Sequence, residues 1–295
     1  MTHSPLAHRT HRQLAVPVPG GTLAVHRWAA DRPDAPVLIA AHGITGNGLS
    51  WAAIADALPD HDVIVPDLRG RAGSRAVSGP YGLARHAEDL VLVLDHLGIT
   101  APVVLAGHSM GGFVACLAAA TQPRRFRKVV LVDGGLGFPT PEGVDTDAVL
   151  AALVGPAIQR LEMEFPSVEA YREFWRRHPA FGDIWNDRTI EYLDHDLIGE
   201  PPQLRSSCVG EAIRADGADV IRDPDTLAAI HHLPVSTTLL WAERGMLNQP
   251  EGLYSRRTLA ALPARIEARL VPGTNHYSIV IGDGARAVAE AVTEP

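Results

Sequence analysis

The sequence has only two cysteines, Cys116 and Cys208, and they lie far apart in the chain. Such a pair supplies neither a disulfide framework nor the spacing of metal ligands. The 14 histidines are scattered, and a single pair, His231 and His232, is adjacent. No two histidines stand four residues apart, as zinc ligands on one helical face would. We therefore expect neither a bound metal nor an organic cofactor.

Long apolar runs and basic clusters are missing too. No run approaches the roughly 20 apolar residues of a membrane helix, and the first residues do not resemble a signal peptide. The chain has 26 basic and 34 acidic residues, a net charge of −8, without a basic stretch interleaved with aromatics. We expect a cytoplasmic protein that binds a small molecule rather than nucleic acid or a membrane. Nothing in the sequence indicates the oligomeric state.

What is present is a strong strand and helix pattern. Residues 13–18 and 22–28 alternate apolar and polar around a Pro-Gly-Gly turn, which predicts an antiparallel hairpin. Short, continuously apolar runs follow, typical of buried parallel strands, at residues 37–41, 63–65, 103–106, 129–132, 235–241 and 266–271. Helices are predicted between them, at residues 81–97, 254–262 and 285–292. The fold class is α/β, with a mostly parallel, twisted sheet.

The rhythm of strands and helices breaks off between residues 137 and 233. We therefore predict a core of residues 1–136 and 234–295, with a helical cap inserted at 137–233. Half of the aromatic residues of the chain fall in this insertion: Phe138, Phe165, Tyr171, Phe174, Trp175, Phe181, Trp185 and Tyr192. Some of them must form the core of the cap, and others are expected to face a pocket.

The most informative motif is residues 107–111, Gly-His-Ser-Met-Gly, between a strand-like run and a helix-like run. A serine hydroxyl is a poor nucleophile, so it must be raised on a tight turn where a base can reach its proton. Gly107 and Gly111 leave room for such a turn. Ser109 is thus a candidate nucleophile.

Four motifs in this order resemble those of the α/β-hydrolase superfamily. They are the His-Gly turn at residues 41–44, the loop at 67–74, the serine elbow at 107–111, and the loop at 271–276 that ends in a histidine. The resemblance covers nearly all of the chain. It implies an α/β-hydrolase fold with an N-terminal antiparallel hairpin and an inserted helical cap.

The resemblance also implies roles for individual residues. Ser109 would attack a carbonyl carbon while His276 takes and later returns its proton. The backbone N–H groups of Ile44 and Met110 would stabilise the oxyanion. His42 and His108 are competing candidates for the base. However, His42 is expected to shape its turn, where His42 and Gly43 border the substrate site, and His108 to point away from Ser109.

The acid of the triad departs from the common family pattern. The family usually places it two residues beyond Glu243, where this chain has Gly245, which cannot orient an imidazole. Asp133, at the end of the strand beside the nucleophile strand, is the first alternative, because neighbouring parallel strands end at the same sheet edge. This placement resembles that of the zearalenone lactonases and of some haloalkane dehalogenases. Glu243 is the second alternative, and a missing acid is the third.

A serine nucleophile favours acyl transfer to water over the alkyl-ester chemistry of aspartate-based relatives. We expect a serine hydrolase that cleaves a small, fairly hydrophobic carboxylic ester or lactone through an acyl-enzyme. Amides are the less favoured substrates. Trp175, Phe181 and Trp185 are the candidate substrate-binding residues of the cap, although each could equally be cap core. A cofactor-free haloperoxidase or a C–C bond hydrolase with the same triad, and a non-catalytic small-molecule binder, are the alternatives.

Overall fold

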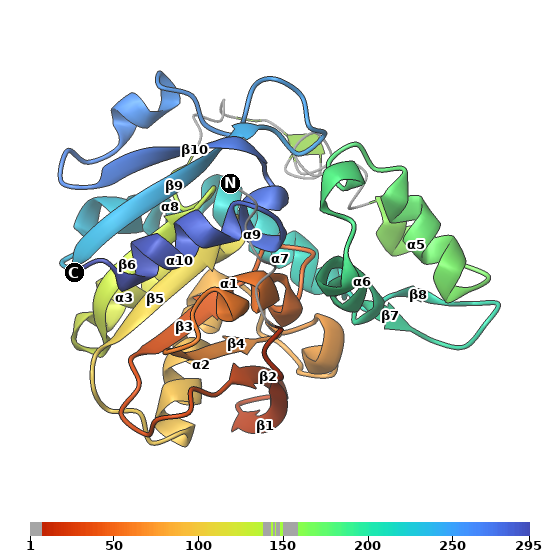
Figure 1. The fold of residues 1–295 in the computed structure, drawn as a ribbon, viewed down its shortest axis with the longest axis horizontal. Coiled ribbons are helices and arrows are strands. Elements are labelled where there is room, and N and C mark those ends of the chain that lie inside the picture. Colours follow the sequence, from red (N-terminus) through yellow and green to blue (C-terminus); the bar gives the residue numbers. More distant parts are fainter. Residues whose placement is uncertain (1–7, 138–142, 144, 146–147, 150–158) are drawn as a thin grey trace.

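The computed structural model describes residues 8–137, 143, 145, 148–149 and 159–295. Its centre is a twisted eight-stranded sheet in the order β1-β2-β4-β3-β5-β6-β9-β10 (Figure 1). Strand β2 is antiparallel to β1 and β4, and all other neighbours are parallel. The strands are β1 (Arg12–Val18), β2 (Gly21–Trp28), β3 (Val37–Ala41), β4 (Asp62–Pro66), β5 (Val103–His108), β6 (Phe126–Val132), β9 (Ser236–Arg244) and β10 (Glu267–Asn275). The predicted hairpin and mostly parallel sheet are confirmed.

Helices cover both faces of the sheet. They are α1 (Ala52–Asp56), α2 (Leu83–His96), α3 (Met110–Thr121), α5 (Val168–Arg176), α6 (Asp187–Asp194), α7 (Gly210–Arg222), α8 (Pro224–Ala229), α9 (Ser278–Ile281) and α10 (Ala285–Thr293). A small antiparallel pair, β7 (Leu197–Ile198) and β8 (Arg205–Ser206), follows α6. Within the described ranges, no helix is long and apolar enough to span a bilayer.

The sheet separates two apolar cores. Because successive side chains of a strand point to opposite faces, Val103 and Leu105 of β5 pack with α2 and α3, whereas Val104 and Ala106 pack with α1, α9 and α10. Both faces are buried, which explains why the strands are continuously apolar rather than alternating. The loops at the carboxyl edge of this rigid sheet are therefore held by packing on both sides.

The inserted segment has two parts. Helices α5 and α6 and the β7/β8 pair form a body beside one end of the sheet (Figure 1, green). Helices α7 and α8 instead pack on the core, where the N–H of Gly82 donates to Asp216 of α7 (2.9 Å) and the N–H of Leu83 to Asp219 (2.8 Å). The cap boundaries at 137 and 233 stay a prediction, and Phe138 lies outside the described residues.

The helix predicted at residues 254–262 is wrong, since only a 3-10 turn forms at Thr258–Ala261. Ser255 and Thr258 exchange hydrogen bonds between side chains and backbone N–H groups (2.7 and 3.3 Å), which compete with helical bonds. Pro263 follows directly. Tyr254 is buried and donates its hydroxyl to the carbonyl of Leu136 (2.8 Å), so this segment ties β9 to the loop after β6.

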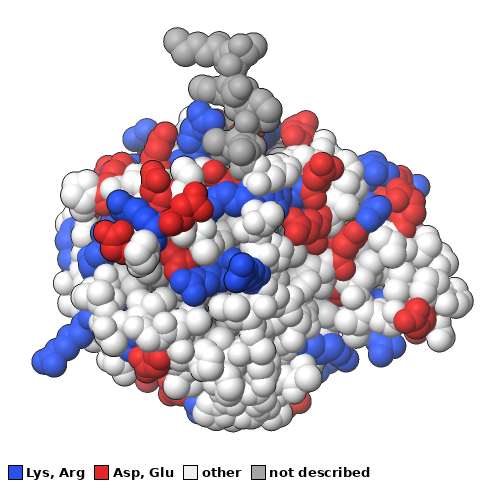
Figure 2. Space-filling model, turned by 60° about the horizontal axis from the view of Figure 1, so that its bottom comes forward, with Lys and Arg blue, Asp and Glu red and all other residues white. Residues whose placement is uncertain are grey.

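Charges on the molecular surface are mixed. On the face shown in Figure 2, basic and acidic side chains lie next to one another above a broad uncharged area, rather than in one continuous basic region. Many basic side chains are ion-paired, as Arg188 is with Asp56 (2.8 Å) and Arg269 with Glu294 (2.6 Å). That nucleic acid is not a partner stays a prediction.

Candidate active site

Ser109 occupies a sharp turn between β5 and α3. Its φ of 55° and ψ of −122° lie in a region that non-glycine residues rarely adopt. Backbone bonds hold the turn, from the Ser109 N–H to the carbonyl of Val132 (3.0 Å) and from the Gly112 N–H to the carbonyl of Ser109 (2.9 Å). A Cβ on Gly107 would lie 2.0 Å from the carbonyl oxygen of Gly111, so the predicted need for glycine is physical. The hydroxyl stands at the wall of a cavity.

His276 follows β10 and is held by a carboxylate. Its Nδ1 lies 2.7 Å from Oδ2 of Asp133, and both residues are buried. A carboxylate only accepts hydrogen bonds, so Nδ1 carries the proton and the lone pair is on Nε2. His276 lines the same cavity as Ser109, without a direct hydrogen bond between the two side chains in this structure. Such bonds are often loose before substrate binds.

Asp133 sits one residue beyond β6, at the carboxyl edge of the sheet. Its N–H donates to the carbonyl of Leu240 (2.7 Å), and its Oδ1 accepts the N–H of Ala242 (3.1 Å). Both contacts are with β9, the neighbour of β6. The backbone at Asp133 has a φ of 44°, a second left-handed non-glycine residue near the elbow. The carboxylate is thereby fixed between two strands and aimed at His276.

Glu243 does not contact the histidine. Its side chain is exposed, and its Oε2 accepts the N–H of Gly273 (2.7 Å), which fixes the irregular last part of β10. At Gly245, a Cβ would lie 1.9 Å from the side chain of Gln249, which fills that space. Of the two carboxylates weighed from the sequence, the structure brings Asp133 to His276 and leaves Glu243 outside. Their catalytic roles stay predictions.

His42 is a structural part of the turn at residues 43–46. The N–H of Leu68 donates to its Nε2 (2.9 Å), so the proton is on Nδ1, which donates to the carbonyl of Gly43 (2.8 Å). Burial lowers the pKa of His42 to about 3, which keeps the ring neutral. Gly43 lines the cavity beside Ser109, where a Cβ would come within 3.3 Å of the serine Cβ. His42 itself is not among the lining residues.

His108 is also not placed to act as the base. Its Nε2 donates to the carbonyl of His276 (2.8 Å), and burial together with the neighbouring His276 holds its pKa well below the ordinary value. The two rings lie 4.7 Å apart between centroids. A neutral His108 thus helps to place the backbone of His276.

Two backbone N–H groups are available at the predicted oxyanion site. Met110 is the first residue of α3, so its N–H has no acceptor within the helix. The N–H of Ile44 donates to no group among the described residues. Ile44 lines the cavity, and Met110 directly follows Ser109 in the chain. The arrangement fits an oxyanion hole, and this role stays a prediction.

The cavity above Ser109 contains about 490 Å³ of space not filled by atoms, part of it open to solvent. Its wall is largely apolar, and the described residues that line it include no Lys, Arg, Asp or Glu. They are Gly43, Ile44, Thr45, Gly46, Ser50, His108, Ser109, Tyr192, Met246, His276, Tyr277, Val280 and Ile281. Sequence reasoning missed Tyr277 and Met246, although Tyr277 is adjacent to the predicted base. It named Tyr192 only among the eight aromatic residues of the insertion, some of which were expected to face a pocket.

The three cap residues singled out from the sequence do not line this cavity. Trp175 and Phe181 are buried in the cap, with ring centroids 4.7 Å apart, and Phe181 packs behind Tyr277 (4.8 Å). Trp185 lies under the guanidinium of Arg176, 4.5 Å from the ring centroid. Their aromatic rings pack against other residues of the cap. Tyr277 contacts Trp175 and Phe181 and also lines the cavity that contains Ser109.

A second polar cluster lies between the core and the cap. His26, Asp67 and His195 could offer three ligand atoms within 4.8 Å of one another to a metal ion. The carboxylate of Asp67 is already occupied, because it also accepts the N–H groups of Gly48 (2.8 Å) and Gly73 (3.0 Å). The cluster is therefore best described as two histidines hydrogen-bonded to one buried carboxylate.

Known proteins resemble parts of the chain in sequence. A "lipase LipV" from Mycobacterium tuberculosis is 33% identical over 143 residues, 48% of this chain and 53% of that protein. A "magnesium-chelatase 30 kDa subunit" from Rhodobacter capsulatus is 38% identical over 100 residues, 32% of this chain and 35% of the subunit. The chain thus spans about half of the lipase and about a third of the subunit.

Solved structures agree on the fold. E-2-(acetamidomethylene)succinate hydrolase superposes with a TM-score of 0.76 at 22% identity, covering 96% of this chain and 98% of the other. The model of the alpha/beta hydrolase fold family matches residues 36–185, which include the His-Gly turn, the serine elbow and Asp133. With the elbow, the buried carboxylate and the histidine in place on this sheet, the chain belongs to the α/β-hydrolase family.

Proposed function

We propose that the protein is a serine hydrolase that cleaves a small, neutral carboxylic ester or lactone through an acyl-enzyme on Ser109. One observation carries the proposal: His276 hydrogen-bonds to the buried Asp133 and shares a cavity wall with a serine on a strained elbow. Membership of the α/β-hydrolase family and the lipase relative support a hydrolase.

The chemistry follows from the positions of the atoms. Nε2 of His276 takes the proton of Ser109 as its Oγ attacks the substrate carbonyl, and Asp133 stabilises the imidazolium that forms. The N–H groups of Ile44 and Met110 stabilise the oxyanion, each typically worth about 100- to 1000-fold in rate. His276 then protonates the leaving group, and water activated by the same ring releases the acid.

The cavity wall supports a neutral, partly apolar substrate. Ile44, Met246, Val280 and Ile281 supply apolar surface, and the lining described above contains no Lys, Arg, Asp or Glu. Tyr192 and Tyr277 add phenol rings whose hydroxyl groups have no hydrogen-bond partner among the described residues. A substrate with a carbonyl or ether oxygen beyond the scissile bond would satisfy them.

A panel of chromogenic esters and lactones tests the proposal, with Ser109→Ala as the matched control. Hydrolysis by the wild type that Ser109→Ala abolishes would support it. Halide- and peroxide-dependent oxidation in carboxylate buffer, without ester turnover, would instead favour a haloperoxidase. Tight binding of a ligand that is never turned over would contradict an enzyme and favour a binding protein.

A further inference from the structure

The Ile44 N–H belongs to the turn at residues 43–46, in which one hydrogen bond joins two peptide groups. The carbonyl of Gly43 belongs to the same peptide as the Ile44 N–H, and it accepts the N–H of Gly46 (3.0 Å). That Gly46 N–H belongs in turn to the peptide of the Thr45 carbonyl. Any group that fixes the Thr45 carbonyl therefore fixes, through one hydrogen bond, the plane of the peptide that presents the Ile44 N–H.

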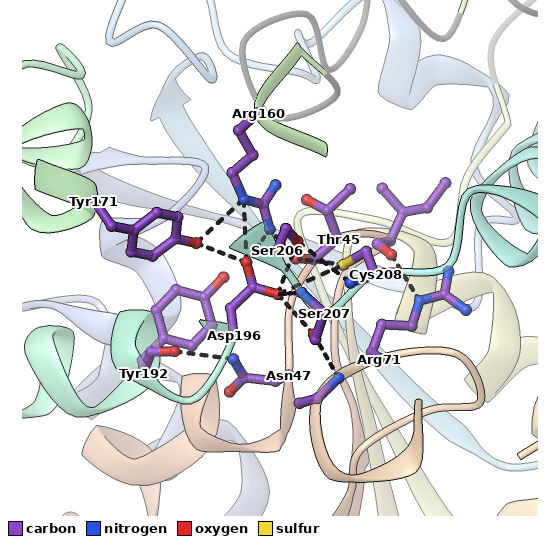
Figure 3. A network of polar contacts seen from close by, with 12 residues as sticks. Thr45, Asn47, Arg71, Arg160, Tyr171, Tyr192, Asp196, Ser206, Ser207 and Cys208 are labelled. Carbon is purple, nitrogen blue, oxygen red and sulfur yellow. Dashed lines mark hydrogen bonds and ion pairs between the residues drawn. The ribbon is translucent and has the colours of Figure 1, made fainter. Parts of the chain in front are cut away.

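The group that fixes the Thr45 carbonyl comes from the inserted segment. Nη2 of Arg160 donates to it at 2.8 Å, and Sγ of Cys208 lies 3.7 Å away (Figure 3). The preceding carbonyl, that of Ile44, accepts a hydrogen bond from Nε of Arg71 of the core at 3.0 Å. Besides the ring of His42, which donates to the carbonyl of Gly43 (2.8 Å), the turn is thus held by one arginine from the core and one from the cap.

Arg160 is itself held tightly by the cap. Only 2% of it is exposed, and Nη2 and Nε lie 3.1 and 3.3 Å from Oδ2 of Asp196. The hydroxyl of Tyr171 donates to the same carboxylate oxygen at 2.6 Å, and the guanidinium lies 5.2 Å from the ring centroid of Trp175. Because these partners all belong to the insertion, a shift of the cap would also move the guanidinium of Arg160.

Asp196 also connects this network back to the core. Its Oδ1 accepts the hydroxyl groups of Ser206 (3.0 Å) and Ser207 (2.8 Å), and the Ser207 hydroxyl accepts the N–H of Ala72 (2.7 Å) (Figure 3). Ala72 directly follows Arg71, the core arginine that donates to the carbonyl of Ile44. Asp196 is therefore connected to both arginines of the turn at residues 43–46, directly to Arg160 and through Ser207 and Ala72 to Arg71.

We propose that Arg160 is a positioning residue for the oxyanion hole, through which the placement of the cap sets the orientation of the Ile44 N–H. The inference rests on the proposed acyl transfer at Ser109. Arg160 touches neither Ser109 nor His276, so it acts on the transition state through the backbone of residues 43–46. A hydrolase with a misplaced cap would then bind substrate but turn it over slowly.

The test compares Arg160→Gln with Arg176→Gln, a matched arginine of the same cap that is partly exposed and pairs with Glu173. For Arg160→Gln we expect kcat to fall roughly 10- to 100-fold, because one donor is displaced rather than removed. KM should change less than threefold, and the midpoint of the pH profile should stay in place. Arg176→Gln should leave kcat within twofold. An unchanged kcat, or a raised KM at unchanged kcat, would overturn the inference.

Chemical rescue gives a readout that general damage to the cap would not. Guanidinium ions added to Arg160→Ala should raise kcat several-fold and leave Arg176→Ala unaffected. If Arg160→Gln fails to fold, Arg160→Lys, which keeps the charge next to Asp196, takes its place with the same expected loss of kcat. Absence of rescue together with full activity of Arg160→Lys would overturn the inference.

Hydrogen exchange separates this inference from the proposed function. Amides of residues 43–46 should exchange faster in Arg160→Gln than in the wild type, whether or not a substrate is known. If the wild type hydrolyses no ester or lactone, the proposed function fails while the exchange result still shows whether Arg160 holds the turn. If the wild type is active and exchange at residues 43–46 is unchanged, the inference about Arg160 fails alone.

Discussion

Nδ1 of His276 lies 2.7 Å from Oδ2 of Asp133, across the carboxyl ends of β10 and β6. The carboxylate that contacts this histidine therefore follows β6, the neighbour of β5, and does not come from β9, which carries Glu243. The sheet order explains the geometry, because β6 lies between β5 and β9 and its end faces the loop after β10. Gly245 leaves the usual position of the acid without a carboxylate.

Backbone strain at the elbow gives a first prediction. Ser109 has a φ of 55° and a ψ of −122°, which glycine adopts without the steric cost that a Cβ imposes. Ser109→Gly should raise the free energy of unfolding by about 1 kcal/mol relative to Ser109→Ala, while both variants lose activity. Urea unfolding of the two variants measures this. Equal stability would mean that the elbow is not strained.

Close backbone packing behind the elbow gives a second prediction. A Cβ on Gly111 would lie 2.2 Å from the carbonyl oxygen of Ala41, so Gly111→Ala must push β3 and α3 apart. We expect a loss of more than about 3 kcal/mol of stability, or no folded protein. Gly182→Ala is the control, because a Cβ there meets nothing within 4 Å. If thermal unfolding shifts equally in both variants, the packing argument is wrong.

The strands and the catalytic candidates could be predicted because their signals are local. Continuous apolar runs mark strands buried on both faces, and the elbow at Ser109 needs glycines at fixed spacing. The pairing of Asp133 with His276 is also expected, as the first of several alternatives, from strand order, from the family resemblance and from the glycine at position 245. The two apolar cores then follow because successive side chains of each strand point to opposite faces of the sheet.

The lining of the cavity could not be predicted, because it depends on how the cap folds. The aromatic surface of Trp175 and Phe181 predicts a place in the cavity wall, but that surface is buried within the cap. Tyr277 lines the cavity only because the loop after β10 turns it there. The support that Arg160 gives to the turn at residues 43–46 joins segments far apart in the chain, which no local pattern shows.

The histidine between cap and core gives a pH-dependent prediction. Burial opposes the charge on His195, but the hydrogen bond and the charge of Asp67 (2.8 Å) outweigh it, so the pKa of His195 is raised. Burial likewise opposes the charge of Asp67, yet hydrogen bonds from His195 and His26 hold its pKa below the usual range. The folded protein thus binds a proton at His195 that the unfolded chain releases near pH 6.5.

The stabilisation by the His195 ion pair is complete below about pH 6.5 and is lost as the pH rises through the raised pKa. The loss of stability caused by His195→Gln, measured by urea unfolding, should therefore be larger at pH 6 than at pH 9. His232→Gln, at an exposed histidine, should show no such dependence. An equal or larger loss at pH 9 would contradict the ion pair.

The most direct test of the proposed relay is kcat for a chromogenic ester in Asp133→Asn and Glu243→Gln, with each variant checked for folding. In Asp133→Asn the amide oxygen is expected to keep the hydrogen bond from the N–H of Ala242, so the NH2 group faces Nδ1 of His276 and neither accepts its proton nor stabilises the imidazolium. We therefore expect kcat to fall by about 10⁴-fold, whereas Glu243→Gln should stay within threefold of the wild type. Full activity of Asp133→Asn together with loss of activity in Glu243→Gln would contradict the account.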